Sequence, residues 1–301
     1  MKLYAPHYYK DFTCIADRCT HSCCIGWEID IDEESAEKYA ALTDGYGAVI
    51  QRSTAGYPPH FCLTEGERCP HLAESGLCNI ITELGEGYLC GICREHPRFY
   101  NYANGRCEVG LGMACEEACR LILTCDGFGT EEIGERDDAD FAPYPTLGAR
   151  EKIFSILADM TLAYPEKLEK LYDFAGVSPD FLTDGEWQDI FASLEYLVPE
   201  HASLFTCYCH RSAPRKELEA PLSRALAYLI YRHATEAEDE EEFRTSLGFC
   251  FLLERLLASL VCEKNAKTAE DMAEYARILS EEIEYSEDNT AALKFEISTA
   301  I

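Results

Sequence analysis

Positive charge is scarce in this sequence of 301 residues. Lys and Arg together number 26 against 55 Asp and Glu, which gives a formal net charge of −29. Recognition of DNA or RNA depends on neutralising phosphates with Lys and Arg, and anionic membranes attract basic segments for the same reason. The composition therefore argues against nucleic-acid binding and against a membrane surface. It suits a basic partner, although an acidic surface also keeps a protein soluble through self-repulsion.

Targeting and membrane segments are missing as well. The first residues, MKLYAPHYYKDF, contain neither the apolar core nor the small-residue cleavage site of a secretory signal. No run of about 18 apolar residues follows that would span a membrane. We therefore expect a cytoplasmic protein, in which disulfides are disfavoured and clustered thiols serve as metal ligands. The odd number of cysteines, 17, also fits a fully paired disulfide framework poorly.

Cysteine, in contrast, is abundant, and it is concentrated in the first part of the chain. Thirteen of the 17 cysteines lie between Cys14 and Cys125, and the densest stretch is FTCIADRCTHSCCIGW at residues 12–27. Cys90 and Cys93 have the C-x-x-C spacing that lets two sulfurs clamp one ion. Zinc sites and iron–sulfur clusters both accept four thiolates, so spacing alone leaves the choice between them open.

An isolated cysteine is more often a buried thiol than a ligand. We apply that interpretation to Cys207 and Cys209, which lie near His201 and His210. A second metal site there is the less favoured alternative.

The hydrophobic pattern predicts a mainly α protein, with an irregular, metal-organised N-terminal part packed on a C-terminal α-helical bundle. We expect a cysteine-rich region over residues 1–125, a connector over 126–150 and a helical region over 151–301. The alternating residues 26–32 predict a short strand, after which Asp32 caps a helix over 33–42. Further helices are expected at 80–84, at 114–123, around Ile153 to Met160, and over 218–230, 243–261 and 272–283, with the stretch 243–261 central because it is apolar on most sides.

Several motifs together resemble the flagellin lysine-N-methylase (FliB-type) family, which is related to the CxxCxxCC zinc- or iron-chelating cysteine-cluster proteins. The matching pieces are FTCIADRCTHSCCIGWEIDID, CPHLAESGLCNI, LGEGYLCGICREHPR and LGMACEEACRLIL, which cover roughly the first 125 residues. The resemblance implies metal-ligand positions at Cys14, Cys19, Cys23, Cys24, Cys69, Cys78, Cys93 and Cys115. Cys90 falls where the family pattern has no invariant cysteine and ranks lower.

The resemblance implies methyl transfer from S-adenosylmethionine to lysines of flagellin, by a protein that carries a [4Fe–4S] cluster, with zinc as the alternative metal. Eight thiols exceed the four that one cluster needs, so either some are bystanders or two sites exist. The competing hypothesis is a non-catalytic zinc- or iron-chelating protein in which thiolates replace part of a hydrophobic core.

The residues themselves support methyl transfer only in part. Gly110-Leu111-Gly112 lacks the pattern of a nucleotide-binding loop, and the C-x3-C-x2-C spacing of radical S-adenosylmethionine enzymes is absent. An amine needs no radical, so we expect polar displacement after loss of the lysine proton. Trp27 is a candidate to stack on the cofactor and Arg98 a candidate to pair with a carboxylate, whereas packing and a surface ion pair are their alternatives. No residue stands out as the general base.

Overall fold

The computed structural model describes residues 1–103, 105–136 and 144–301, which form two compact units. Unit 1 contains Met1–Phe12 and Phe99–Ile301, and unit 2 contains Thr13–Arg98. The expected boundary after residue 125 falls inside unit 1. The expected connector, 126–150, holds strand β6 (Thr130–Glu135) and the start of helix α6 (Leu147–Ala158), while its residues 137–143 lie outside the described part.

Unit 2 consists of short elements around a small core that includes sulfur atoms. Its helices and strands are α1 (Glu33–Ala40), α2 (Gly45–Arg52), β2 (Thr54–Ala55), β3 (His60–Phe61), α3 (Asn79–Leu84) and α4 (Gly91–Glu95), with short 3-10 helices at Ala16–Arg18 and Glu86–Tyr88. Its buried core residues are Ile29, Ile31, Tyr39, Ile50, Phe61, Cys69, Ile80 and Cys90. Two of these eight are cysteines, so thiols form part of the core itself.

Two local features were predicted near the start of unit 2, a helix cap at Asp32 and a short strand over residues 26–32. The predicted cap is confirmed, because Asp32 Oδ1 accepts a hydrogen bond from Ser35 N at 2.9 Å and α1 follows at Glu33. The strand expected over residues 26–32 is wrong. Within that stretch the structure has only one isolated bridge, from Asp30 to His60 of the two-residue strand β3, which is too short to pair with a longer strand.

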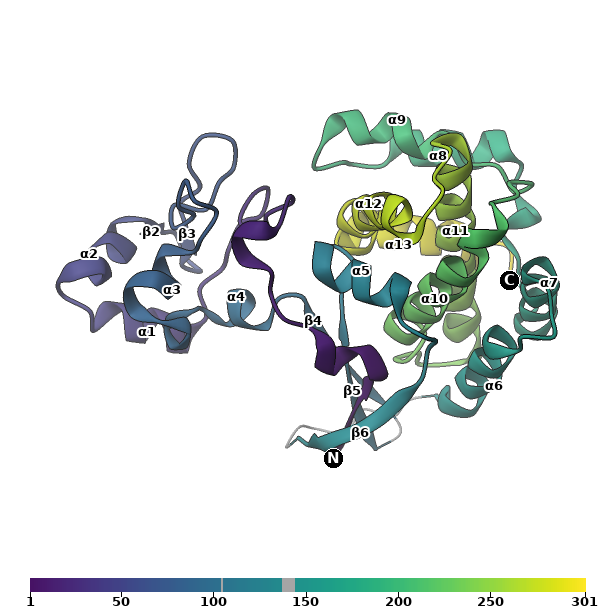
Figure 1. The fold of residues 1–301 in the computed structure, drawn as a ribbon, viewed down its shortest axis with the longest axis horizontal. Coiled ribbons are helices and arrows are strands. Elements are labelled where there is room, and N and C mark those ends of the chain that lie inside the picture. The colour runs from purple at the N-terminus through teal and green to yellow at the C-terminus, as the bar shows by residue number, and fades with distance from the viewer. Residues whose placement is uncertain (104, 137–143) are drawn as a thin grey trace. The chain divides into compact units, whose positions relative to one another are not determined.

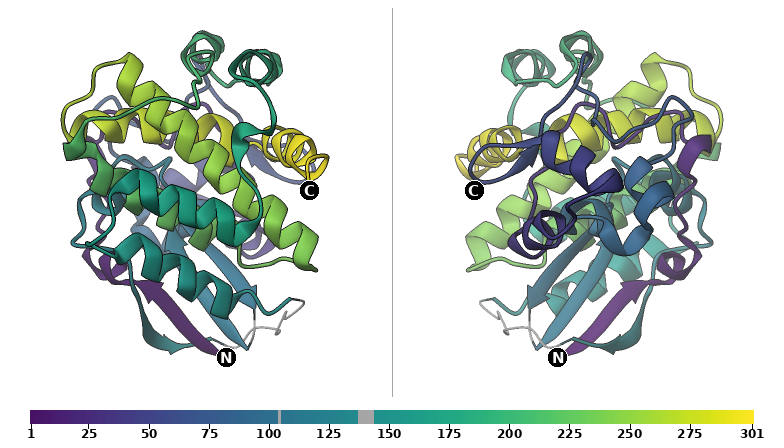
Figure 2. Two further views of the ribbon diagram at one scale, coloured as in Figure 1. Left: turned by 90° about the vertical axis from the view of Figure 1, so that its right-hand side faces the viewer. Right: turned by 90° about the vertical axis from the view of Figure 1, so that its left-hand side faces the viewer.

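Unit 1 contains a four-stranded sheet in the order β4–β5–β1–β6. Its strands are β1 (Lys2–Pro6), β4 (Arg98–Ala103), β5 (Arg106–Leu111) and β6. Strand β1 pairs in parallel with β5 and antiparallel with β6, where a register shift occurs between Leu3 and Tyr4. Figure 2 shows helices of unit 1 lying above these strands.

The remaining helices of unit 1 build its main hydrophobic core (Figure 1). They are α5 (Glu116–Thr124), α6, α7 (Tyr164–Ala175), α8 (Asp184–Ser193), α9 (Ala202–Phe205), α10 (Lys216–His233), α11 (Glu240–Glu263), α12 (Ala269–Leu279), a π-helix (Ser280–Glu284) and α13 (Glu287–Ser298). Helix α11 is long and apolar enough to cross a membrane, yet 89% of its most apolar window is buried within the structure. It is a core helix, as its pattern predicted.

The mainly α class is therefore confirmed, and each of the expected back-half helices has a counterpart. One detail is wrong. Met160 was placed on the apolar face of a helix, but α6 ends at Ala158 and the Met160 side chain is 89% exposed. The turn at 159–161 is formed instead by Asp159, whose Oδ1 accepts from Thr161 N at 2.8 Å.

A buried ion group joins the sheet to the helices. Glu108 of β5 is 1% exposed, accepts a hydrogen bond from Arg150 of α6 at 2.8 Å and forms an ion pair with Arg106 at 2.6 Å. The amide of Asn101 in β4 donates to the backbone oxygen of Tyr231 in α10 at 2.9 Å. These polar contacts connect the sheet to α6 and α10.

Candidate metal centre

Seven of the eight predicted ligand cysteines belong to unit 2, and Cys115 belongs to unit 1. Cys115 is the residue before α5, half-buried against the core of unit 1. Within unit 2, Cys14 and Cys23 are exposed and Cys19 is half-buried, with its Sγ donating to the backbone oxygen of His21 at 2.8 Å. The ligand roles of these four residues stay predictions.

Five thiols of unit 2 lie close enough to act on one another: Cys24, Cys69, Cys78, Cys90 and Cys93. All five belong to the core cluster of unit 2, either as buried members or packed directly against it. Four of the predicted ligands, Cys24, Cys69, Cys78 and Cys93, thus come together with Cys90. The family pattern gives Cys90 no ligand position, whereas its C-x-x-C spacing from Cys93 indicates that it belongs with these thiols.

Backbone contacts set the positions of the first two sulfurs. The backbone N–H of Cys69 donates to the carbonyl of Cys24 at 2.8 Å, which joins two loops far apart in sequence. Ser22 Oγ accepts from Cys24 N at 3.2 Å and fixes the turn before it. The adjacent Cys23 is exposed, although its side chain still hydrogen-bonds with that of Cys24.

Two of the five cysteines are helix N-cap residues. Cys78 precedes α3, and burial raises the pKa of its thiol although the nearby N–H groups of Ile81 and Ile80 oppose that shift. Cys90 precedes α4, and neither sulfur makes a cap hydrogen bond. The start of α4 is held by Asp32, whose Oδ2 accepts from Gly91 N at 2.6 Å.

The pKa is lowered for two of these thiols, Cys24 and Cys90, and raised for others. The hydrogen bond with Cys23 lowers the pKa of Cys24 to about 7, assisted by Ser22 and by the charge of Arg68. The hydrogen bond between Cys90 and Cys93 lowers the pKa of Cys90 and raises that of Cys93. Burial raises the pKa of Cys69 to about 12. Loading a metal must therefore release protons from the buried thiols.

The donor set fits a soft metal or an iron–sulfur cluster. Soft thiolates in an apolar shell select zinc, Cu(I) or iron–sulfur clusters over hard cations. Structural zinc and [4Fe–4S] clusters both accept four thiolates, so the donor set accommodates either.

His71 lies beside these cysteines but has a structural role. It is fully buried, its Nδ1 is 3.0 Å from Tyr46 Oη and its Nε2 is 3.2 Å from Ser53 Oγ. Burial lowers the pKa of His71 to about 4, so the ring is neutral. Because both nitrogens already have hydrogen-bonding partners, His71 holds the loop between Cys69 and Cys78 against α2.

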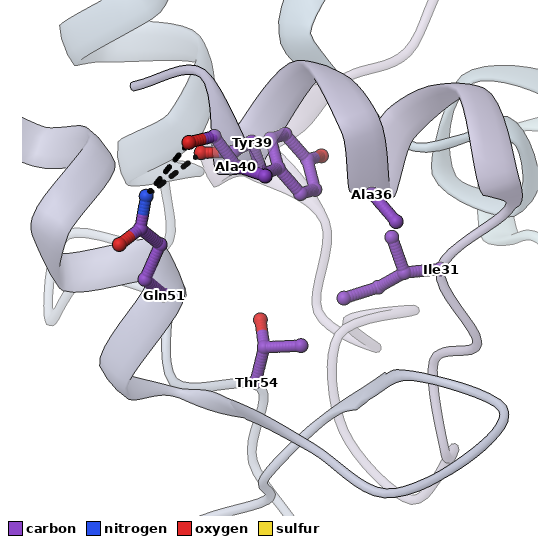
Figure 3. Close-up of a pocket in the computed structure, with 6 residues that line it drawn as sticks. All are labelled: Ile31, Ala36, Tyr39, Ala40, Gln51 and Thr54. Atoms are coloured by element: carbon purple, nitrogen blue, oxygen red, sulfur yellow. Dashed lines mark hydrogen bonds between the residues drawn. The ribbon is translucent and has the colours of Figure 1, made fainter. Parts of the chain in front are cut away.

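A pocket of about 280 Å³ adjoins the thiol group. Figure 3 shows the side chains around it, which are Ile31, Ala36, Tyr39, Ala40, Gln51 and Thr54. Tyr39 connects pocket and centre, since it lines the pocket while burial and the charges of Cys90 and Cys93 raise its pKa. Its hydroxyl donates to the carbonyl of Tyr88 at 2.6 Å. The pocket is mostly apolar, and the Gln51 amide donates to the carbonyl of Leu42 at 2.7 Å.

The two cofactor candidates are both half-buried, Trp27 in the loop before α1 and Arg98 at the start of β4. Their roles stay predictions. Glu28 and Asp30 are exposed and lie with His60, so that one ligand atom of each falls within 4.8 Å of the other two. Gly110 and Gly112 serve packing, because a Cβ at either would collide, with the ring of Phe99 and with the Tyr285 hydroxyl respectively.

A buried polar network in unit 1 was not predicted from the sequence. Glu284, at the end of the π-helix, has a fully buried side chain, and it accepts from His233 Nε2 at 2.7 Å and from the Tyr228 hydroxyl at 3.2 Å. Hydrogen bonds from His233 and the charge of Arg232 keep the pKa of Glu284 below its usual range despite burial. π-Helical turns often mark functional positions, but nothing in the local sequence SEEIE distinguishes this turn from α-helix.

Comparisons with known proteins identify relatives over part of the chain. The chain is 28% identical over 126 residues to the flagellar biosynthetic protein FliU of Salmonella muenchen, a match that spans 39% of this chain and 75% of FliU. It is 25% identical over 126 residues to lysine-N-methylases of Salmonella choleraesuis and Salmonella typhimurium, again 39% of this chain but 31% of each methylase. No protein-family model matches the chain, and no solved structure matches it. The resemblance to the FliB-type lysine-N-methylases is thereby confirmed.

Proposed function

From its similarity to the lysine-N-methylases, we propose that this chain transfers methyl groups from S-adenosylmethionine to lysine side chains of flagellin. We further propose that a [4Fe–4S] cluster is held in unit 2 by four of the thiols Cys24, Cys69, Cys78, Cys90 and Cys93. The group of five thiols is the observation that carries the proposal, because it supplies a soft-metal site in a chain that resembles these methylases.

The reaction we propose is a polar displacement. The neutral lysine amine forms a bond to the methyl carbon, the carbon–sulfur bond of the sulfonium breaks, and one proton leaves the nitrogen. A lysine has a pKa near 10.4 in water, so the site must desolvate the ammonium or accept its proton before attack. When bound, the cluster supplies a rigid, charged scaffold for unit 2. The pocket beside it supplies apolar walls and one phenol, Tyr39.

The acidic composition supports a lysine-bearing substrate. A net charge of −29 raises the local concentration of cationic partners and speeds their association at low salt. The flagellar name of FliU and the lysine named in the methylases both agree with flagellin as that partner. Trp27 and Arg98 remain our candidates for contacts with the cofactor.

Anaerobic purification followed by iron and sulfide analysis tests the cluster. We expect about four irons per chain and thiolate-to-iron absorption near 400 nm. A colourless protein that holds stoichiometric zinc would contradict it. Transfer of labelled methyl from S-adenosylmethionine to purified flagellin tests the activity, with flagellin whose lysines have been acetylated as the control. Label incorporated equally into both would refute lysine as the acceptor.

One observation favours a second candidate function, a non-catalytic metal-chelating protein. The thiols of unit 2 replace apolar residues of a small core, as metals do in modules too small to fold on hydrophobic burial alone. Calorimetry with S-adenosylmethionine separates the two functions. Binding by the metal-loaded chain supports the methylase, whereas no heat of binding from a chain with its full metal content favours the chelating protein.

A further inference from the structure

A short antiparallel pairing in unit 2 brings one carboxylate and one imidazole face to face. Asp30 and His60 form an isolated bridge. Two backbone hydrogen bonds flank this bridge, from Ile31 N to Pro59 O at 2.8 Å and from Phe61 N to Ile29 O at 3.0 Å. Asp30 and His60 are therefore a non-hydrogen-bonded pair, the arrangement in which opposite side chains stand closest together.

A second carboxylate, that of Glu28, lies on the same face. Burial alternates along residues 28–31, as it does in a strand: Glu28 and Asp30 are exposed, whereas Ile29 and Ile31 belong to the core of unit 2. One ligand atom each of Glu28, Asp30 and His60 lies within 4.8 Å of the other two. The polar face of this pairing thus gathers two carboxylates and an imidazole around one point.

The imidazole of His60 is held in place by the turn that precedes it. Gly56 lies against the ring, and a Cβ there would collide with it. His60 Nδ1 is 3.6 Å from Glu28 Oε1 and 3.3 Å from the carbonyl oxygen of Pro58. Two ligand atoms bound at 2.0–2.1 Å to a tetrahedral ion stand about 3.4 Å apart. The separation of Nδ1 and Oε1 is close to that value, and metal binding would replace the contact with Pro58.

The charge of this face is not balanced by basic residues. In the part of the chain that the structure describes, the one ion pair formed by Glu28 or Asp30 is that of Glu28 with His60. Side chains of both carboxylates and of His60 are accessible to solvent, with exposures of 66% for Glu28 and 31% for His60. An ion that carries two positive charges would neutralise the two carboxylates, and it could enter directly from water.

We propose that Glu28, Asp30 and His60 bind a divalent first-row metal ion, manganese or zinc, as a ligand set separate from the thiol group. Carboxylates suit manganese and imidazole suits zinc, whereas thiolates select softer metals. The imidazole binds in its neutral form, so it loses no proton when the ion enters. Three protein ligands leave further coordination positions to water on the exposed side. The ion would tie residues 28–30 to the turn that ends at His60.

The test uses Mn(II) as the probe, because thiolates bind it poorly and the thiol group would not compete for it. The full chain is prepared without oxygen, with the metal of the thiol group retained, and free Mn(II) is followed by electron paramagnetic resonance. We compare Asp30→Asn with Glu37→Gln on α1, because each removes one exposed negative charge from unit 2. Wild type and Glu37→Gln are expected to bind one Mn(II) per chain, and Asp30→Asn to bind it at least about 10-fold more weakly.

A second variant, His60→Gln, distinguishes a built site from general attraction to an acidic surface. Pulsed resonance of Mn(II) bound to the wild type should show coupling to an imidazole nitrogen, and His60→Gln should lose it. Circular dichroism verifies that each variant is folded. Equal Mn(II) affinity in Asp30→Asn and Glu37→Gln would overturn the proposal, as would the absence of nitrogen coupling in the wild type. Loss of iron from the thiol group in Asp30→Asn would show that the two sites are not separate. None of these outcomes depends on methyl transfer.

Discussion

Replacement of Cys90 by Ser tests the centre of unit 2 most directly. Cys90 is fully buried, caps α4 and shares a hydrogen bond with Cys93, yet the family pattern gives it no ligand position. If it is a ligand, serine cannot replace it, because an alcohol stays protonated where a thiol ionises. Loss of groups that merely orient a ligand already weakens metal binding 10- to 100-fold. Loss of the ligand itself should therefore cost at least about 100-fold, or about 2.7 kcal/mol.

The assay is urea unfolding of wild type and Cys90→Ser, each with metal bound and after chelation, together with metal content. Without metal, the two proteins should differ by only about 1 kcal/mol, the value of one hydrogen bond. With metal, the difference should grow by at least 2 kcal/mol, because binding to the folded state adds to stability. Cys62→Ser, at an exposed position, is the matched control. An equal difference with and without metal, with metal content unchanged, would refute a ligand role for Cys90.

Three further predictions concern unit 1. Glu108→Gln should lower its unfolding free energy by about 3–5 kcal/mol, measured by chemical denaturation, because Arg150 would stay buried without its partner; a loss below 1 kcal/mol would contradict the pairing. Gly112→Ala should lower the unfolding free energy by about 1–3 kcal/mol, since its Cβ meets the Tyr285 hydroxyl. Gly148→Ala on α6 meets nothing and should raise the unfolding free energy by up to about 1 kcal/mol. A change of the same sign in both variants would be inconsistent with the packing. Burial raises the pKa of Glu254, so the folded state keeps its proton longer than the unfolded state, and stability should fall as the pH rises above the unfolded value of about 4.5. Glu254→Gln should remove that part of the pH dependence, and unfolding curves of both proteins at pH 4 and pH 7 measure it.

The helical part of the fold was predictable because its signals are local. Helix α11 is apolar on most sides and lies buried, and Asp32 caps α1 as its position indicated. The sheet was not predictable. Its strands β1 and β6 pair across about 130 residues, and β6 reads TEEIGE, which is acidic and largely exposed. An exposed edge strand shows no alternation of apolar and polar residues, so this stretch resembled a connector.

The candidate site was predictable in its chemistry more than in its membership. The density of thiols predicted a metal-ligand set, and the structure brings Cys24, Cys69, Cys78 and Cys93 together, while their ligand roles stay predictions. Cys90 was ranked low because the family pattern was given more weight than the C-x-x-C spacing. Cys115, by contrast, belongs to unit 1, whereas the thiol group lies in unit 2. Spacing reports which sulfurs share a turn, but only the loops' hydrogen bonds, such as that between Cys69 and Cys24, decide which turns meet.

The helices that follow Cys78 and Cys90 in unit 2 are very short. Helices α3 and α4 have six and five residues, too few to be stable on their own in water. Each begins immediately after a cysteine of the thiol group, α3 after Cys78 and α4 after Cys90. A metal bound as proposed would hold Cys78 and Cys90 in place, and with them the starts of α3 and α4. The fold of unit 2 would then depend on that metal, because the apolar core of this unit is small.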